Sequence, residues 1–366
     1  MLESGGISFF SLLIMNEPEV TLTTPTVSIL LPNLNNRDFL EERLRTIVEQ
    51  TYADWELIVI DGYSDDGAWE LIGEFAARDP RFRISQAPPK GVYAALNRAI
   101  QLARGEYVYL AMSDDTMTLD CLDRMVSALE AYPDCEVCHC CLQIIDETGN
   151  ELEDWRQFES VRFYGERINR LHVRKAPLDG ILHCALYMMY CSLTQLLLRR
   201  SIFQKVGLFP TSHGSIGDFE WNMRVGLACN ILHVPETLAT WRRHSTQATD
   251  AAFLHSANFH ARLCEMITAT LPMLALYEPA LYKRIRLSRL LLPYRQRQCI
   301  IGMGEQQGWK QKITYLLRFM LISPRCSIDF ILNRFQGKLR YLDNIAYIQQ
   351  ELERLNLDIE DYVELC

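Results

Sequence analysis

The chain has 366 residues, of which 49% are hydrophobic and 23% are charged. This composition excludes a peptide-sized or disordered protein and predicts a sizeable core. The 46 Asp and Glu residues outnumber the 37 Lys and Arg residues, and a net charge of −9 excludes a protein that binds nucleic acid with its whole surface. Twelve cysteines without an evenly spaced framework favour a reducing compartment, so we expect a cytoplasmic protein.

Two apolar stretches resemble targeting or membrane segments by length alone. Residues 7–15 are not preceded by Lys or Arg, so we interpret residues 1–24 as a poorly ordered leader and not as a signal peptide. Residues 181–198 approach the length of a bilayer span but contain His183, Ser192, Thr194 and Gln195. We therefore predict a buried segment there, and no transmembrane helix in the chain.

From Thr26 the pattern alternates between short apolar runs and helical periodicity. Strands are predicted at residues 27–31, 55–60, 82–84 and 107–112, with helices between them at about 37–50, 71–75 and 92–102. This order predicts an α/β fold with a Rossmann-like, mostly parallel sheet and flanking helices. The predicted domain covers residues 25–250, and a helical region follows over residues 251–366.

Three carboxylates follow strands of the predicted sheet. Asp61 ends the second strand, and Asp114 and Asp115 follow the fourth. Because ligands in open α/β sheets bind beyond the carboxyl ends of the strands, we expect these side chains to share one crevice. Adjacent carboxylates repel unless a cation lies between them, and Mg²⁺ or Mn²⁺ bound with a substrate diphosphate would supply one. The alternative is that Asp114 caps the next helix and Asp115 faces water.

Residues 26–115 resemble the nucleotide-binding half of the family 2 glycosyltransferases, which have the GT-A fold. The matching motifs are residues 27–32 (VSILLP), 40–42 (LEE), 50–52 (QTY), 56–62 (ELIVIDG) with Ser64, Asp66 and Gly67, 91–97 (GVYAALN), 103–107 (ARGEY) and 113–115 (SDD). The resemblance implies donor binding by Pro32, Asn33, Asp61, Gly91, Asn97 and Asp114, with Asp61 on the nucleobase. It also implies that Asp114 and Asp115 hold Mg²⁺ or Mn²⁺ against the diphosphate, although Met112 stands where many members have Asp.

Downstream motifs extend the resemblance more loosely. Residues 197–201 and 205–209 resemble the acceptor-side segment, and residues 217–221 (GDFEW) resemble the site of the general base. Inverting transfer requires a carboxylate that takes the proton of the attacking hydroxyl. Asp218 is the candidate and Glu220 the rival, while a helix N-terminus with acids that complement its dipole would explain either residue.

Residues 241–244 (WRRH) resemble a segment in which a histidine completes the metal site in some family members. The resemblance therefore adds His244 to the predicted metal ligands. Arg242 and Arg243 would pair with phosphate or with surface acids. A lone histidine is as readily structural, so both interpretations of His244 stay open.

A cysteine cluster surrounds His139. Cys135, Cys138, Cys140 and Cys141 suggest a zinc site, but a strand over residues 137–145 would point neighbouring side chains to opposite faces. Because free cysteine is commonly buried, we interpret the cluster as core packing.

The helical region is electrically polarised. Residues 283–340 carry 13 Lys and Arg against Glu305 and Asp329, about +11, whereas residues 341–366 carry about −6. Basic side chains interleaved with leucines predict a peripheral membrane contact, and the alternative is a helical bundle packed on the catalytic domain. A membrane contact would place the protein at the inner face of the membrane.

These patterns together predict an inverting glycosyltransferase that moves a sugar from a nucleotide diphosphate donor to a hydroxyl of a saccharide or lipid-linked acceptor, in polysaccharide or glycolipid biosynthesis. One alternative is a nucleotidyltransferase, which the sequence disfavours because residues 32–36 (PNLNN) replace its glycine-rich basic loop. The other is a degenerate, non-catalytic nucleotide-sugar-binding or scaffolding module at the membrane surface. We expect no nucleic-acid partner.

Overall fold

The computed structural model describes residues 24–158, 161, 163–186, 189–247, 251–335 and 344–366. The predicted leader lies outside these residues except for Thr24, and so do Lys338 and Arg340 of the basic stretch.

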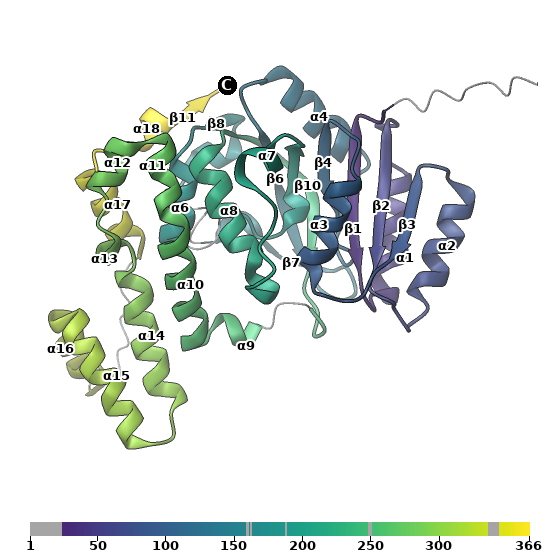
Figure 1. Cartoon of the computed structure of the whole chain (residues 1–366). Helices are drawn as coiled ribbons and strands as arrows, with labels where there is room; N and C mark the ends of the chain where they lie inside the picture. Colours follow the sequence, from purple (N-terminus) through teal and green to yellow (C-terminus); the bar gives the residue numbers. More distant parts are fainter. Residues whose placement is uncertain (1–23, 159–160, 162, 187–188, 248–250, 336–343) are drawn as a thin grey trace, which may run out of the picture.

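One mixed sheet runs through the protein in the order β11-β8-β10-β6-β9-β4-β1-β2-β3, with β5 and β7 beside it (Figure 1). Its first block is parallel, and comprises β1 (Val27–Asn33), β2 (Trp55–Asp61), β3 (Phe82–Gln86) and β4 (Tyr107–Leu110). A second parallel pair, β6 (Val137–Ile145) and β10 (Ile231–Arg242), is joined to it by β9 (Leu196–Arg199), which is antiparallel to both β4 and β6. The remaining strands, which pair antiparallel, are β5 (Thr116–Met117), β7 (Glu151–Asp154), β8 (His172–Arg174) and β11 (Val363–Leu365).

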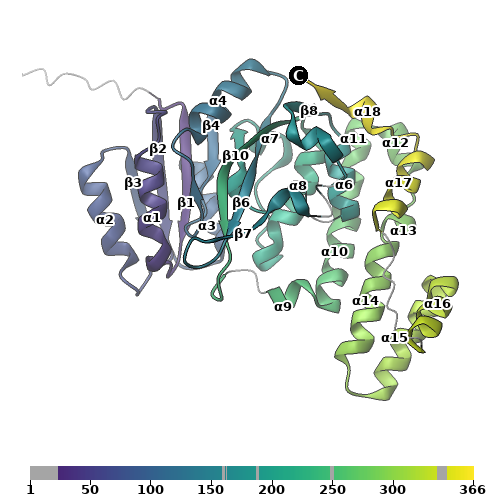
Figure 2. The ribbon, with the colours of Figure 1, turned by 180° about the vertical axis from the view of Figure 1, so that it is seen from behind.

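Helices cover both faces of the sheet (Figures 1 and 2). One face packs against α1 (Arg37–Val48), α2 (Ala68–Arg78) and α4 (Cys121–Ala131), and the other against α3 (Val92–Leu102), α6 (Leu178–Leu186) and α8 (Gly217–Ala228). Side chains alternate between these faces, so Ile29 and Leu31 enter one core and Leu30 the other. Burial on both faces explains why the strands are continuous apolar runs in the sequence.

The predicted α/β fold is confirmed, with small shifts at strand ends. β1 continues through Pro32, which pairs with Ile60 of β2. On the other side the β4 ladder has already ended at Leu110, so the missing N–H of Pro32 breaks no ladder there. β4 is two residues shorter than predicted, because the chain turns after Ala111 donates to the Leu30 carbonyl.

The described part of residues 181–198 is buried apart from the half-buried Cys191, as predicted from its polar side chains, and it includes most of α6 and of β9. Thr194 and Gln195 are fully covered. No helix in the described part of the chain is long and apolar enough to span a membrane.

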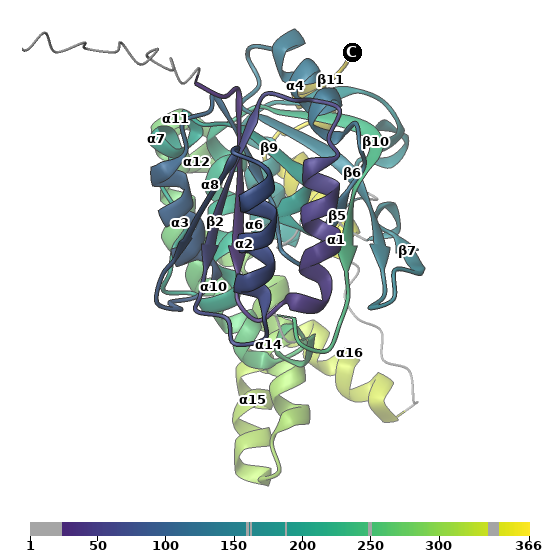
Figure 3. The same ribbon diagram turned by 90° about the vertical axis from the view of Figure 1, so that its right-hand side faces the viewer.

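The C-terminal region is helical and packs on the sheet domain. Phe259 and Leu263 of α10 share a core with Phe219 of α8, and β11 returns to pair with β8, so the predicted boundary near 250 separates stretches of sequence that share one core. The long helices are α10 (Ala257–Thr270), α14 (Leu292–Glu305), α15 (Trp309–Ile322), α16 (Pro324–Phe335) and α17 (Asn344–Arg354). Shorter ones are α7 (Ile202–Val206), α9 (Ala251–Leu254), α11 (Leu274–Tyr277), α12 (Pro279–Arg284), α13 (Leu287–Leu290) and α18 (Ile359–Tyr362). Helices α14, α15 and α16 form an arm that projects from the body (Figures 1 and 3).

Candidate active site

A cavity of about 1390 Å³ opens at the carboxyl ends of β1, β2 and β4. At one end Pro32, Asn33 and Gly62 form its wall, and at the other Tyr294 and Arg297 of α14 do so. The cavity therefore runs from the sheet edge, where the sequence predicted the ligand crevice, to the C-terminal helical region.

Asp61 is buried at the end of β2, behind the residues that line the cavity, and holds their side chains in place. Its buried carboxylate accepts hydrogen bonds from Asn33 Nδ2 (2.9 Å), Ser64 Oγ (2.6 Å) and Gln86 Nε2 (3.0 Å). Burial favours the neutral acid, but these hydrogen bonds outweigh it, and the pKa of Asp61 lies below its ordinary value. The Asn33 side chain is thereby fixed, and within the described residues its buried Oδ1 has no hydrogen-bond partner. Asn33 lines the cavity, and the role of Asp61 in base recognition stays a prediction.

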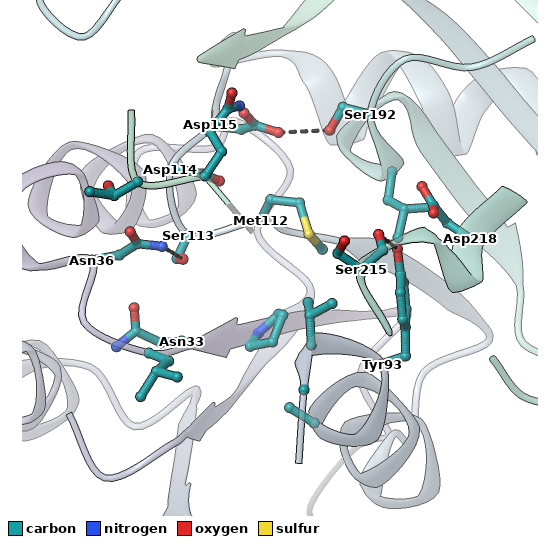
Figure 4. Close-up of a pocket in the computed structure, with 18 of the residues that line it drawn as sticks. Asn33, Asn36, Tyr93, Met112, Ser113, Asp114, Asp115, Ser192, Ser215 and Asp218 are labelled. Atoms are coloured by element: carbon teal, nitrogen blue, oxygen red, sulfur yellow. Dashed lines mark hydrogen bonds between the residues drawn. The ribbon is translucent and has the colours of Figure 1, made fainter. Parts of the chain in front are cut away.

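Asp115 lines the cavity, but its carboxylate is buried and fully engaged in hydrogen bonds. Its carboxylate accepts from Ser192 Oγ and Thr194 Oγ1, both at 2.7 Å, and from the backbone N–H of Arg242 at 3.0 Å (Figure 4). Burial, and secondly the charge of Asp114, raise the pKa of Asp115 to about 7. These contacts make Asp115 a group that positions the loop after β4.

Asp114 lies at the cavity wall beside His244. Asp114 Oδ2 is 3.0 Å from His244 Nε2, and His244 Nδ1 is 2.8 Å from Thr246 Oγ1. The imidazole also packs against the Phe39 ring, with centroids 4.6 Å apart. Both ring nitrogens of His244 thus have partners, and Nε2 would exchange its contact with Asp114 for a bond to the metal if an ion were bound between them.

The predicted metal site is therefore only partly assembled. The structure brings Asp114 and His244 together but directs the carboxylate of Asp115 toward Ser192. Across the described residues, no group of three or more His, Cys, Asp or Glu side chains is placed to hold a metal. A carboxylate and an imidazole fit Mn²⁺ or Mg²⁺ where substrate phosphates and water complete the coordination.

Arg242 is a structural residue of this wall and not a free phosphate ligand. Its guanidinium is buried, donates to the Asp114 carbonyl (3.0 Å) and pairs with Glu42 (2.6 Å). It therefore ties the loop after β4 to α1. Arg243 lines the cavity and pairs with Glu153.

Asp218 stands on the other side of Met112 from Asp114 (Figure 4). It is the second residue of α8 and lines the cavity. Burial raises the pKa of Asp218 to about 6, which interaction with the Tyr93 hydroxyl partly offsets. Asp218 Oδ1 is buried without a hydrogen-bond partner among the described residues. A carboxylate with a pKa near 6 and a free oxygen is suited to accept a proton near neutral pH.

Glu220 lies on a different side of the same helix. Both of its oxygens accept from the guanidinium of Arg224, at 2.8 to 3.1 Å, and Thr270 of α10 donates to it. Two residues along an α-helix turn a side chain by about 200°. Of the two predicted candidates for the base, the structure therefore places Asp218, and not Glu220, among the described residues that line the cavity.

Gly91 and Asn97, both predicted as donor-binding residues, take different places on α3. Gly91 lines the cavity at the start of the helix, where its φ of 92° disfavours any side chain. Asn97 bonds through both amide atoms to the backbone of Phe209, at 2.8 and 3.0 Å. Asn97 thereby fixes the segment before α8 and is not among the residues that line the cavity, and its donor contact stays a prediction.

A second cluster of ionisable side chains is buried between β6, β8 and β10. His139 Nδ1 and His233 Nδ1 are 3.0 Å apart, His172 stacks on His233 with ring centroids 4.7 Å apart, and Arg174 pairs with Asp179 at 3.3 Å. Burial, and then the charge of Arg174, lower the pKa of His172 to about 4. The same causes lower the pKa of His139 and His233 well below the ordinary range. The cluster is therefore a packed part of the core, in which neutral histidines surround a buried ion pair.

The cysteines near His139 are also part of the core. Cys135, Cys138, Cys140 and Cys141 are free thiols with side chains at most 2% exposed. Burial raises the pKa of Cys135 and of Cys141 to about 12, so both are protonated at neutral pH.

The sequence analysis missed several residues of the cavity. Tyr93 donates to the Ser215 carbonyl at 3.0 Å, Asn36 donates to Ser113 at 2.7 Å, and α14 contributes Tyr294 from almost 200 residues further along the chain. The only signal of such roles in the sequence is the presence of Tyr93 and Ser113 inside the recognised motifs, and Asn36 and Tyr294 lie outside all of them.

Comparison with known proteins identifies the family that the first half of the chain matches. The family model described as Glycosyl transferase family 2 matches residues 28–206. A putative teichuronic acid biosynthesis glycosyltransferase, TuaG of Bacillus subtilis, is 30% identical over 103 residues, which are 28% of this chain and 41% of that protein. A PGL/p-HBAD biosynthesis glycosyltransferase of Mycobacterium bovis is 34% identical over 97 residues, 26% of this chain and 38% of that protein. The chain thus spans less than half the length of these two relatives.

The fold has a counterpart among solved structures. TarS of S. aureus, crystallised in complex with UDP-GlcNAc, superposes with a TM-score of 0.59 at 15% identity, and the match covers 82% of each chain. The likeness at this identity concerns the fold alone. The family match places residues 28–206 in glycosyltransferase family 2, and the likeness to TarS shows that the chain has the GT-A fold.

Proposed function

We propose that the chain transfers a sugar from a nucleotide diphosphate sugar to a hydroxyl acceptor, with inversion at the anomeric carbon. The observation that carries this proposal is the placement of Asp114 and Asp218 on opposite sides of Met112 in one cavity. In-line displacement requires the leaving group and the attacking hydroxyl on opposite sides of the anomeric carbon. A site with a phosphate-binding side and a proton-accepting side has this form.

The donor would bind with its nucleoside at the β1 and β2 end. Asn33 lines the cavity and its buried Oδ1 has no partner among the described residues, so this amide would accept an N–H of the base. Asp61 would hold this amide in place through Nδ2, at 2.9 Å. Gly91, which has no side chain, leaves the α3 side of the cavity open. TarS was crystallised with UDP-GlcNAc, which supports a nucleotide-sugar donor.

Asp114 and His244 would hold Mg²⁺ or Mn²⁺ together with the diphosphate of the donor. When bound, the ion would neutralise charge on the departing diphosphate. Asp115 would keep the loop after β4 in position through Ser192 and Thr194. Asp218 would take the proton of the acceptor hydroxyl at its free Oδ1 as that oxygen attacks.

The acceptor would enter from the α14 end, where Tyr294 and Arg297 line the cavity. Relatives named for teichuronic acid and PGL/p-HBAD biosynthesis favour a saccharide or glycolipid acceptor in a polysaccharide or glycolipid pathway. The degenerate-module alternative lacks a comparable observation, because Asp218 retains a free oxygen and a raised pKa.

The donor site is tested by thermal denaturation of the full chain with UDP-, GDP- and dTDP-sugars, with and without Mn²⁺. A ligand that binds only the folded state raises the melting temperature. We expect a Mn²⁺-dependent rise with one nucleotide class that Asp114→Asn abolishes. Asp38→Asn is the matched control, since Asp38 is an exposed carboxylate on the cavity wall. Absence of a rise with every donor would contradict the proposed function.

A further inference from the structure

The projecting arm carries apolar side chains on its outside. On α15 these are Trp309, Ile313, Leu317, Met320 and Leu321, and on α16 they are Ile328 and Leu332. Leu321 is 84% exposed and Trp309 68%. On each helix they recur every three or four residues, so each set forms one face. On the opposite side of α15, Phe319 packs against Cys299 and Met303 of α14 and forms the small core of the arm. The exposed face takes no part in this core.

Basic side chains flank this apolar face. Lys310, Lys312 and Arg318 of α15 and Arg325 of α16 are exposed, and among the described residues none of them forms an ion pair. The sequence of α15 contains no Asp or Glu. A helix with an apolar face and unpaired cations at its margin is typical of helices that lie in the interface of an anionic membrane.

We propose that the face formed by these seven apolar side chains, with the four flanking cations, docks the protein on an anionic lipid surface. The apolar side chains would enter the boundary between headgroups and acyl chains, while the cations contact lipid phosphates. A second copy of the chain fits this face less well. Pairing identical surfaces about a two-fold axis would bring the same unpaired cations together without acids to neutralise them.

Helix α14 connects the arm to the cavity. The first half of α14 supplies Tyr294 and Arg297 to the cavity wall, and the second half packs against α15. A helix of 14 residues is about 21 Å long, so docking through the arm would hold the acceptor end of the cavity within roughly that distance of the membrane. The docked orientation suits an acceptor whose lipid stays in the bilayer. Binding to lipid is independent of the donor chemistry, so it can be tested apart from the proposed function.

Flotation of the full chain with vesicles provides the test. We expect binding to vesicles of phosphatidylcholine and phosphatidylglycerol, weaker binding to phosphatidylcholine alone, and weakening by salt. The variant Leu317→Asp with Leu321→Asp should lower the partition coefficient at least tenfold. Its control is Leu119→Asp with Leu152→Asp, which changes two exposed leucines outside the arm and should bind like the wild type.

A charge variant tests the second half of the proposal. Replacing Lys310, Lys312 and Arg318 with Gln should weaken binding to the anionic vesicles by roughly a hundredfold, because each basic side chain contributes about fivefold. Circular dichroism establishes that each variant is folded. Equal binding by the arm variant and its control would overturn the proposal. A second result would also overturn the proposal. In it, the wild type does not bind anionic vesicles but forms a dimer in sedimentation velocity, and the leucine variant is a monomer.

Discussion

The cavity at the ends of β1, β2 and β4 and the buried cluster between β6, β8 and β10 contain similar side chains in different surroundings. Asp218 and His244 lie at or beside a cavity of about 1390 Å³, whereas His139, His172 and His233 are fully covered. In the cluster, burial and Arg174 hold the histidines neutral. In contrast, Asp218 lines a cavity that a substrate can enter, and its buried Oδ1 has no hydrogen-bond partner among the described residues. Because His172 Nε2 and Arg174 Nη1 of the cluster also have no hydrogen-bond partner among the described residues, the difference teaches that access to an open cavity, and not an unused polar atom, separates the candidate base from the packed groups.

The largest expected effect is at Asp218. Asp218→Asn keeps the shape of the side chain but removes the proton acceptor, so we expect kcat to fall by about 10²- to 10⁴-fold. Donor binding should persist, and thermal denaturation with the donor measures it. Glu220→Gln provides the comparison on the same helix. Loss of turnover in Glu220→Gln with normal turnover in Asp218→Asn would assign the base to Glu220 instead.

Substitutions in the buried cluster should change the stability of the protein and not its catalytic activity. Asp179→Asn leaves Arg174 buried without its charged partner and removes an acceptor of the Tyr190 hydroxyl. We expect the free energy of unfolding to fall by about 3 to 5 kcal/mol, measured by urea denaturation. Glu41→Gln, which breaks an exposed pair with Arg45, should cost less than about 1 kcal/mol. Similar losses in both variants would show that the cluster is not the packed core we describe.

The pH dependence of catalysis sharpens the contrast further. Asp218 must be ionised to accept a proton, and burial raises its pKa to about 6. Below that pH the fraction of ionised Asp218, and with it kcat/KM, should fall about tenfold per pH unit. Rate profiles at saturating metal measure this slope. A profile that is flat between pH 5 and 7 would contradict the role of Asp218.

The smallest expected effect is the pH dependence of stability at His172. Its pKa is about 4 in the folded protein and about 6.5 when unfolded, so the unfolded chain binds more protons below pH 6.5. Stability contributed by neutral His172 is present above pH 6.5 and is lost as the pH falls toward 4. Acidification from pH 7 to 5.5 should cost about 1 kcal/mol at this residue. In urea denaturation, the same acidification should lower the free energy of unfolding of His172→Gln by about 1 kcal/mol less than that of the wild type. An equal decrease in both proteins would exclude the effect.

Periodicity and motif order predicted the parallel strands and the residues that follow them. Strands at 27–31 and 55–60 were found because burial on both faces requires continuous apolar runs, and Asp114 was found because ligands gather at strand ends. The side-chain directions within the motifs were not predictable in this way. Asp115 and Asn97 belong to the motifs, yet their polar atoms bond to Ser192, Thr194 and the backbone of Phe209, all far away in sequence.

The sequence by itself determined the fold class, the family and the set of residues from which the site is drawn, because these depend on local periodicity and on short motifs. Only the tertiary structure decided which member of each acidic pair is free. Asp218 and Glu220 are both carboxylates near the start of the same helix. Glu220 is hydrogen-bonded to Arg224 and Thr270, whereas Asp218 lines the cavity. Tertiary structure likewise decided that α14 closes the cavity and that one face of α15 stays exposed. The physical reason is that partners for buried polar atoms come from distant segments, and a one-dimensional pattern does not contain those distances.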